Sequence, residues 1–411
     1  SVSSRPFLSF PPEYFIDHRP IKELDDVVGA HAVRVPYYMA GATDVYIEKG
    51  DRELWLSLEK LWKKITGKKM YITYGFGSRY EGEAFGEDYE LPNDRAYSET
   101  CASVAAAMWA WRMFLASGNA EYMELIEGVL YNSALAGISL DGTRYFYVNP
   151  LADYFKKHQR SPWFECACCP PNIARLLAYL PGMIYSLSRN GEIMINLFIG
   201  SRATFEIKGN KIEISMKTGY PWYGETYIEI EPEKVDEIPI MIRIPSWVEE
   251  PIVKIDGEEL RGEPSRYVRI IRKWDRGSKI SLKFRLKPKI IKSHPYIEAD
   301  HGKIAIRRGP IIYCIESIDN RDFDLRNLAV DPHSLNLKEI FRNDILNGVI
   351  VIEGDGYILK AISNEDRLYY ELNGDRALEL ERTRFTAIPY YAWGNRGPSQ
   401  MAVWIKILKL C

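Results

Sequence analysis

The sequence has 411 residues, a formal net charge of −2 and no long apolar run, and these features exclude several classes of protein. A nearly neutral charge gives no reason to expect a nucleic-acid partner. Because no stretch is long and apolar enough, we predict no membrane span. The length leaves room for two or three domains.

The chain opens with residues 1–20, which are rich in proline and predicted to be irregular. Residues 22–48 carry mostly small side chains on one face, which predicts a helix that Pro36 kinks or interrupts. Apolar residues from 54 onward predict a second helix that ends near Gly67. Together these two helices are expected to form a helical hairpin.

A glycine-rich loop over residues 70–96 follows, and a loop of this length inside a compact domain usually serves a function. Helices near 97–117 and 120–138 are predicted to form a second hairpin. Residues 139–165 are expected to be irregular, and a helix over 170–187 closes the helical part.

From about residue 189 the pattern changes, because apolar and polar residues alternate in runs such as 211–216. Such runs, separated by short turns, indicate antiparallel β-sandwiches. The sequence therefore predicts an α+β multidomain protein, with a helical domain (1–188) and two antiparallel β-sandwich domains (189–300 and 301–411).

The predicted helices pair in hairpins with long loops at one end, an arrangement typical of an α/α toroid. The five helices predicted here cannot close such a ring. We therefore expect a second polypeptide, or another copy of the chain in a homo-oligomer, to complete it. Inner hairpin faces left exposed would favour that association.

Four of the six cysteines lie in two short stretches. Cys166, Cys168 and Cys169 precede two prolines, which favour the first turn of a helix. Cys101 and Glu99 flank the entry of the helix near 97–117. Three thiols and a carboxylate are the ligand count of a tetrahedral zinc site, which would be structural or catalytic. An oxidised cysteine pair is the alternative.

The other two cysteines, Cys314 and Cys411, are far apart in the chain. This spacing does not form a disulfide framework. Reduced thiols that hold a metal ion fit better, and they predict a cytoplasmic protein. Cys314 lies in an isoleucine-rich strand and is expected to be buried.

Short motifs run along nearly the whole chain. They are Ala30–Arg34, Lys69–Thr73, Gly82–Gly86, Leu91–Asn93, Ala96–Cys101, Leu130–Asn132, Tyr147–Leu151, Cys166–Asn172, Ile244–Trp247, Arg308–Pro310 and Trp393–Arg396. With these motifs in this order, the sequence resembles the β-L-arabinofuranosidase family, a group of cysteine-dependent glycoside hydrolases. The cysteine motif is highly specific, whereas the short motifs are weak on their own.

The resemblance implies an (α/α)6 catalytic barrel followed by β-sandwich domains. Residues 1–188 match the C-terminal half of that barrel, and its N-terminal half is absent from the sequence, so either another polypeptide completes the barrel or the sequence is a fragment. The implied activity is retaining hydrolysis of a small carbohydrate substrate, a plant-type arabinose glycoside or a related sugar. The implied cofactor is zinc, with ligands matched to Glu99, Cys101, Cys168 and Cys169.

The resemblance also implies roles for individual residues. Cys168 matches the nucleophile and Glu83 the general acid/base, while His31 and Tyr147 match residues that contact the sugar. Cys166 matches none of the four zinc ligands of the family and is expected to line the pocket.

Glu83 and His31 also have simpler interpretations. The neighbours of Glu83 are small or apolar, which predicts a raised pKa. Glu81 is the alternative acid/base, and either carboxylate is otherwise a solvated loop residue. His31 is otherwise a buried histidine of the helical core.

Two other classes of function stay open. One is a non-catalytic helical and β-sandwich protein with a structural zinc site. The other is a sugar epimerase built on a helical toroid, which would require paired catalytic histidines that the sequence does not supply. One half of a split enzyme is a further interpretation of the glycosidase.

Overall fold

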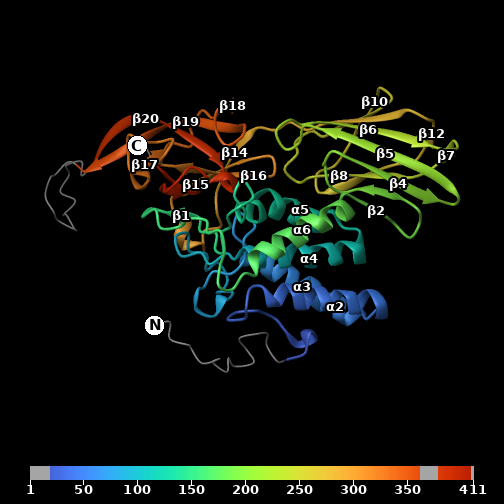
Figure 1. Ribbon diagram of the computed structural model, residues 1–411, viewed down its shortest axis with the longest axis horizontal. Helices are drawn as coiled ribbons and strands as arrows, with labels where there is room; N and C mark the ends of the chain where they lie inside the picture. The colour runs from blue at the N-terminus through green and yellow to red at the C-terminus, as the bar shows by residue number, and fades with distance from the viewer. Residues whose placement is uncertain (1–18, 362–377, 409–411) are drawn as a thin grey trace.

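The computed structural model describes residues 19–361 and 378–408, and in these ranges helices come first and strands follow (Figure 1). The helices lie together beneath two groups of strands. The predicted mixed α+β architecture is confirmed. Among the described residues, every helix is too short or too polar to cross a bilayer.

The helical part is organised around one buried helix. Its elements are η1 (Ile21–Glu23), α2 (Arg34–Lys49), α3 (Arg52–Lys68), η2 (Glu81–Glu83), α4 (Thr100–Ser117), α5 (Ala120–Val129), the π-helical turn η3 (Leu130–Ala134) and α6 (Cys169–Ile184). Nearly every residue of α4 up to Ala110 is buried, and many are alanines. Small side chains let neighbouring helices approach closely, so α4 forms the centre of the helical core.

Several helix boundaries differ from the prediction. The first helix begins at Arg34 rather than at residue 22, and Pro36 therefore lies in its first turn, where a missing N–H costs nothing. Asp51 accepts hydrogen bonds from two backbone N–H groups at the start of α3, a normal cap. The helix predicted over 120–138 ends at Val129 and continues only as a π-helical turn.

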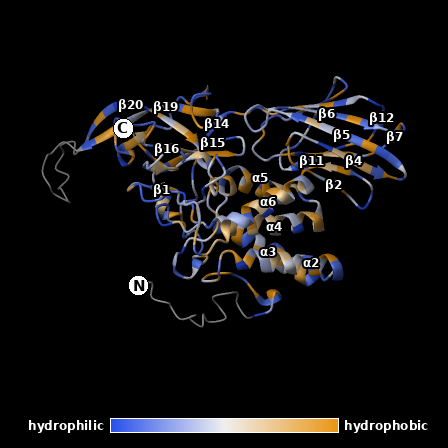
Figure 2. Cartoon of the chain, viewed as in Figure 1, coloured by the Kyte–Doolittle hydropathy of each residue, from blue (hydrophilic) through white to orange (hydrophobic). Residues whose placement is uncertain are grey.

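Two sheets share the second core. The six-stranded sheet has the order β10-β9-β13-β6-β5-β4 and the four-stranded sheet the order β11-β8-β3-β2, with a separate β12-β7 pair. Their bounds are β2 (Tyr185–Leu187), β3 (Ile193–Ile195), β4 (Ser201–Ile207), β5 (Asn210–Thr218), β6 (Glu225–Pro232), β7 (Asp236–Glu237), β8 (Ile240–Ile244), β9 (Ile252–Ile255), β10 (Glu258–Arg261), β11 (Arg266–Ile270), β12 (Lys273–Trp274) and β13 (Ser278–Lys283). Figure 2 shows polar and apolar residues alternating along these strands, and the apolar ones, mainly isoleucines, form one buried cluster.

The remaining strands form a ten-stranded sheet of order β1-β21-β16-β20-β19-β17-β22-β15-β14, with β18 paired to β19. Their bounds are β1 (Ala152–Asp153), β14 (Pro288–Ile291), β15 (Lys303–Arg308), β16 (Ile311–Glu316), β17 (Leu328–Val330), β18 (Lys338–Arg342), β19 (Val349–Ala361), β20 (Leu378–Pro389), β21 (Met401–Ala402) and β22 (Ile405–Ile407). The short helical turns η4 (Glu298–Asp300), η5 (Leu325–Asn327) and η6 (Tyr390–Ala392) connect them.

The sequence predicted purely antiparallel strands, but the structure also contains parallel pairs. The β3–β8 and β17–β22 pairs are parallel. Because the side-chain alternation of a strand is the same in both orientations, the sequence pattern does not distinguish them. As predicted, Cys314 is buried, in β16.

A buried ion pair fastens the helices to the four-stranded sheet. Arg243 of β8 is fully buried, and its Nη2 donates to Glu127 Oε1 of α5 at 2.6 Å. Its Nε donates to the carbonyl of Asn196 at 2.6 Å. The guanidinium has exchanged water for these partners, so each charge depends on the other.

We expect the Glu127→Gln variant to lower the free energy of unfolding by about 3–5 kcal/mol, because it leaves the Arg243 charge buried and unpaired. Chemical denaturation followed by circular dichroism measures this. Glu121→Gln, an exposed position on the same helix, should change it by less than about 0.5 kcal/mol. Equal denaturation midpoints for Glu127→Gln and the wild type would contradict the assignment.

Candidate functional site

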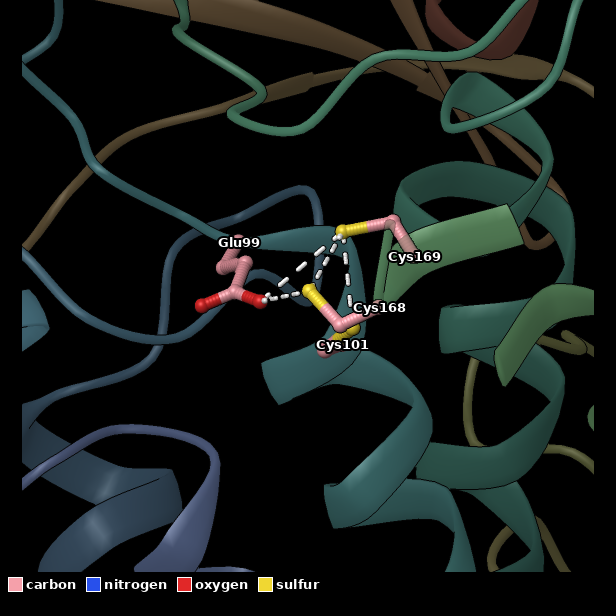
Figure 3. A group of neighbouring side chains, drawn as sticks. All are labelled: Glu99, Cys101, Cys168 and Cys169. Atoms are coloured by element: carbon pink, nitrogen blue, oxygen red, sulfur yellow. Dashed lines mark hydrogen bonds between the residues drawn. The ribbon is translucent and has the colours of Figure 1, made fainter. Parts of the chain in front are cut away.

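Two helix entries bring together four side chains that could ligate a metal ion, as the sequence predicts (Figure 3). Glu99 is the N-cap of α4, and Cys101 lies in the first turn of that helix. Cys168 is the N-cap of α6 and Cys169 its first residue, and prolines follow at once. One ligand atom from each residue lies within 4.8 Å of the other three.

The distances within this cluster fit a metal ion better than a disulfide. Cys169 Sγ lies 3.4 Å from Cys101 Sγ and 3.7 Å from Cys168 Sγ. Glu99 Oε1 lies 3.4 Å from Cys168 Sγ. Disulfide sulfurs are about 2.05 Å apart, and the described cysteines are all free. Three thiols and one carboxylate that converge in this way could hold a metal ion.

The electrostatics of the cluster also favour a cation. Burial, and then the nearby Cys168 sulfur, raise the pKa of Glu99 to about 8. Hydrogen bonds from Cys101 and Cys169 hold the pKa of Cys168 well below that of an ordinary thiol. The ionised form is thus favoured at Cys168 and disfavoured at Cys101 and Cys169, whose pKa values are raised. A cation among the donors would favour the ionised form of all of them.

Three further side chains surround the cluster, and sequence reasoning did not assign them. The Tyr97 hydroxyl donates to Glu99 Oε2 at 2.9 Å. Asn172 Nδ2 donates to Cys101 Sγ at 3.0 Å, and its Oδ1 accepts from the Tyr37 hydroxyl at 3.2 Å. Tyr97 and Asn172 lie inside the two cysteine motifs, and this position in the sequence could have identified them as neighbours of the cluster. Tyr37 lies on α2, far away in the sequence, and no motif marked it as a neighbour of the cluster.

Tyr147 lies beside the cluster because its segment pairs with the entry of α4. The Thr100 N–H donates to the Tyr147 carbonyl at 2.9 Å. The Tyr147 hydroxyl stabilises the Cys168 thiolate by a hydrogen bond and lowers its pKa further. The Phe164 ring packs edge-on against Tyr147, with centroids 5.6 Å apart. Tyr147 is thus in contact with Cys168, the predicted nucleophile.

His31 and Glu83 form a pair that the sequence did not predict. Residues 29–32 hydrogen-bond to residues 83–85 as a short two-stranded ladder. His31 Nδ1 accepts from the Val33 N–H at 3.1 Å, which leaves the proton on Nε2. That Nε2 lies 3.0 Å from Glu83 Oε2 and donates to it.

The pKa of Glu83 differs from the prediction. Its apolar neighbours had predicted a raised value, but the hydrogen bond from His31, together with the nearby Tyr97 hydroxyl, holds the pKa below its usual range. The Tyr97 hydroxyl, which donates to Glu99 of the cysteine cluster, therefore also lies close to Glu83. Glu81 points away instead, with its side chain 78% exposed and Arg95 at 3.5 Å.

The loop that presents Glu83 has an unusual backbone. Gly82 and Glu83 have φ angles of 75° and 51°, and Ser98, just before Glu99, has 37°. A non-glycine residue in this region costs about 1–3 kcal/mol and often marks a functional site. The backbone at Ser98 lies close to Gly75, where a Cβ atom would lie 1.9 Å from Ser98 Oγ. A glycine at position 75 therefore leaves room for the Ser98 side chain. Cys166, by contrast, is exposed and lies outside the four-residue cluster.

Comparison with known families covers most of the chain. Residues 5–182 match the model described as β-L-arabinofuranosidase, GH127 catalytic domain. Residues 192–286 match the GH127 middle domain, and residues 288–406 the glycoside hydrolase family 127 C-terminal domain. The chain belongs to glycoside hydrolase family 127.

Comparison with individual proteins agrees with this assignment. A non-reducing end β-L-arabinofuranosidase of Bifidobacterium longum subsp. longum is 33% identical over 96% of this chain and 62% of its own length. The crystal structure of a GH127 β-L-arabinofuranosidase from Geobacillus stearothermophilus T6 superposes with a TM-score of 0.91, at 37% identity, over 96% of this chain and 63% of that one. A structure described as a glycoside hydrolase superposes with a TM-score of 0.89 at 30% identity. The match covers 98% of this chain and 70% of that chain.

The family 127 chain therefore spans slightly under two thirds of the length of the Bifidobacterium and Geobacillus proteins. The match extends through the helices and both strand regions. The cysteine cluster and the Glu83 pair lie within the part that matches the catalytic domain.

We expect protein purified without chelator to contain close to one equivalent of a divalent metal ion per chain, because four converging donors repel one another without a cation. Elemental analysis measures this. Cys169→Ser should lose most of the metal, whereas Cys314→Ser, a buried cysteine outside the cluster, should keep it. A metal-free protein with reduced, ordered side chains at the cluster would refute the site.

Proposed function

We propose that this chain carries the catalytic centre of a retaining glycoside hydrolase of the β-L-arabinofuranosidase type, acting on plant-type arabinose glycosides or a related sugar. One observation carries the proposal. A thiol with a lowered pKa, Cys168, and a carboxylate held by a histidine, Glu83, lie near each other and near Tyr97, whose hydroxyl donates to Glu99 of the cysteine cluster. Retaining hydrolysis needs such a pair, a nucleophile and an acid/base.

In the first step the Cys168 sulfur forms a bond to the anomeric carbon while the bond to the leaving oxygen breaks. Glu83 gives its proton to that oxygen, so the aglycone departs as an alcohol. In the second step Glu83 takes a proton from water, the water oxygen bonds to the anomeric carbon, and the carbon–sulfur bond breaks. The sugar leaves with its original configuration, and Cys168 returns to a thiolate.

We propose zinc as the metal ion, with Glu99, Cys101, Cys168 and Cys169 as its ligands. Three thiols and a carboxylate at one point suit zinc better than calcium or magnesium, which prefer oxygen. Bound there, zinc would favour the thiolate forms and fix their positions. The hydrogen bond from Asn172 to Cys101 would orient one of the ligands.

His31 and Tyr147 are proposed to contact the sugar, and Cys166 to line the entrance of the pocket. His31 has a second proposed task, because its Nε2 holds Glu83 in place. Tyr147 is already in contact with Cys168, so a sugar that reaches the sulfur would also meet this ring.

The wider organisation is also part of the proposal. We propose a catalytic part of an (α/α)6 barrel at 1–188 and β-sandwich domains at 189–300 and 301–411, supported by the change from helices to strands near residue 185. Further barrel helices would come from a longer form of the polypeptide, a second polypeptide or a second copy. Reduced cysteines support a cytoplasmic location.

We predict that a bromoacetamide derivative of arabinose alkylates Cys168, because the sugar directs the reagent to the most nucleophilic sulfur. Peptide mass spectrometry of the natural full-length protein or complex locates the label. Cys166→Ser tests selectivity, since Cys166 is the exposed thiol in the same peptide. A label on Cys166 or Cys101 instead would refute Cys168 as the nucleophile.

We predict that Glu83→Gln lowers turnover of a natural arabinoside by roughly 10²–10⁴-fold, the usual worth of acid–base catalysis. It should keep its metal, and the first step with an activated aryl arabinoside should suffer less. Glu81→Gln should resemble the wild type. Because the pKa of Glu83 is lowered, the wild-type first step should speed up as the pH falls toward that pKa.

Kinetics and elemental analysis on the same samples separate the outcomes of this experiment. Loss of metal in Glu83→Gln would make it a structural residue. Full activity of Glu83→Gln with a natural arabinoside would transfer the acid/base role to another carboxylate, such as Glu81. A wild-type protein that binds metal but neither hydrolyses nor reacts with arabinose derivatives would favour a structural metal site.

A further inference from the structure

The six-stranded sheet has a polar face that is not part of the proposed active site. Its other face packs in the isoleucine core that it shares with the four-stranded sheet. On the polar face lies a hollow of about 550 Å³ that crosses β5, β6, β13 and β9. Its lining residues are Ser215, Lys217, Tyr227, Ile228, Glu229, Lys254, Asp256, Gly257, Lys279, Ile280 and Ser281.

An aromatic ring lies in the middle of this hollow. Tyr227 is 59% exposed, although tyrosine usually gains by being covered. In the sheet register it pairs with Lys217 on β5 and with Ser281 on β13, and Ser281 pairs in turn with Lys254 on β9. The ring thus offers an apolar face between hydrogen-bonding groups, a combination typical of ligand sites.

The charges of the hollow favour an anion. Asp256 is paired with Arg272 at 3.2 Å. In the described ranges, no ion pair involves Lys217 or Lys279, which lie on either side of β6. Glu229, the remaining acidic group, lies opposite Lys279 in the β6–β13 register, and Lys254 lies 3.7 Å from Glu259. The lining therefore holds three lysines and two acidic residues, a small excess of positive charge around Tyr227.

A second hollow makes the site elongated. It measures about 520 Å³ and lies beside the first over β4, β5 and β6. Both hollows are lined by Ser215 and Glu229, so they form one continuous depression. It is lined by four glutamates and three basic residues, with Arg202 3.3 Å from Glu213 and Arg276 3.3 Å from Glu231. A ligand that fills both would be an extended chain rather than a single small molecule.

We propose that this face binds a polysaccharide chain that carries carboxylate groups. A pyranose ring would stack on Tyr227, with a uronate carboxylate near Lys217 or Lys279, and neighbouring units would extend over β4. The role of such a chain as the polymer that bears the arabinosides rests on the proposed function. The binding itself does not, because it requires neither the cysteine cluster nor Glu83.

Affinity electrophoresis of the natural full-length protein in gels that contain polygalacturonate tests the proposal, with a neutral arabinan as comparison. The polygalacturonate should retard the wild type. Tyr227→Ala should weaken binding by about tenfold, as loss of an exposed aromatic anchor does, whereas Tyr227→Phe should retain it. The matched control Tyr223→Ala, at a tyrosine 54% exposed in the preceding turn, should bind normally.

The contribution of the lysines to binding can be tested separately. Lys217→Ala and added salt should both weaken binding, since exposed charges are screened. Hydrolysis of a small aryl arabinoside should be unchanged in Tyr227→Ala, which keeps the binding result separate from the catalytic one.

Three results would overturn the proposal. The first is no retardation by polygalacturonate, or equal retardation of Tyr227→Ala. The second is equal binding to neutral arabinan, which would refute the acidic ligand. The third is a change of oligomeric state in Tyr227→Ala by sedimentation, which would make this face a contact between copies of the chain.

Discussion

Three sulfur atoms and one carboxylate oxygen, mostly buried and within 4.8 Å of one another, set the constraint on which this structure depends. Such groups cannot all ionise without a cation, and they cannot stay this close by chance. Two helix entries from distant parts of the chain must be held at a fixed separation. One of these entries begins the buried α4 helix and directly follows the turn at Ser98, whose φ angle is positive.

The Glu83 side of the site has its own support. Lys69 is buried and lies 3.1 Å from both Asp26 and Asp88, and its Nζ donates to the Gly86 carbonyl. These contacts fasten the two segments that form the ladder between residues 29–32 and 83–85. A buried charge keeps its geometry only while all its partners stay in place. The His31–Glu83 contact is thus set by a rigid frame rather than by a mobile loop.

The sequence predicted the cluster because its signals were local. Two prolines after Cys169 marked a helix entry, and a family motif singled out Glu83 as the predicted acid/base. What it could not predict depended on contacts between distant segments. The lowered pKa of Glu83 comes from His31, which lies close only after the ladder forms. The late start of α2 and the parallel strand pairs likewise depend on packing, which residue patterns do not encode.

The short strand β1 comes from the segment just before the cysteine motif, yet it pairs with β21 near the end of the chain. Asn132 of η3 adds hydrogen bonds to both Pro310 and Ile312. The C-terminal sheet is therefore completed by residues of the helical part. In protein engineering this sheet cannot serve as an interchangeable cassette. A chimera between family members would have to carry over β1 and Asn132 with it, or leave an edge of this sheet unpaired.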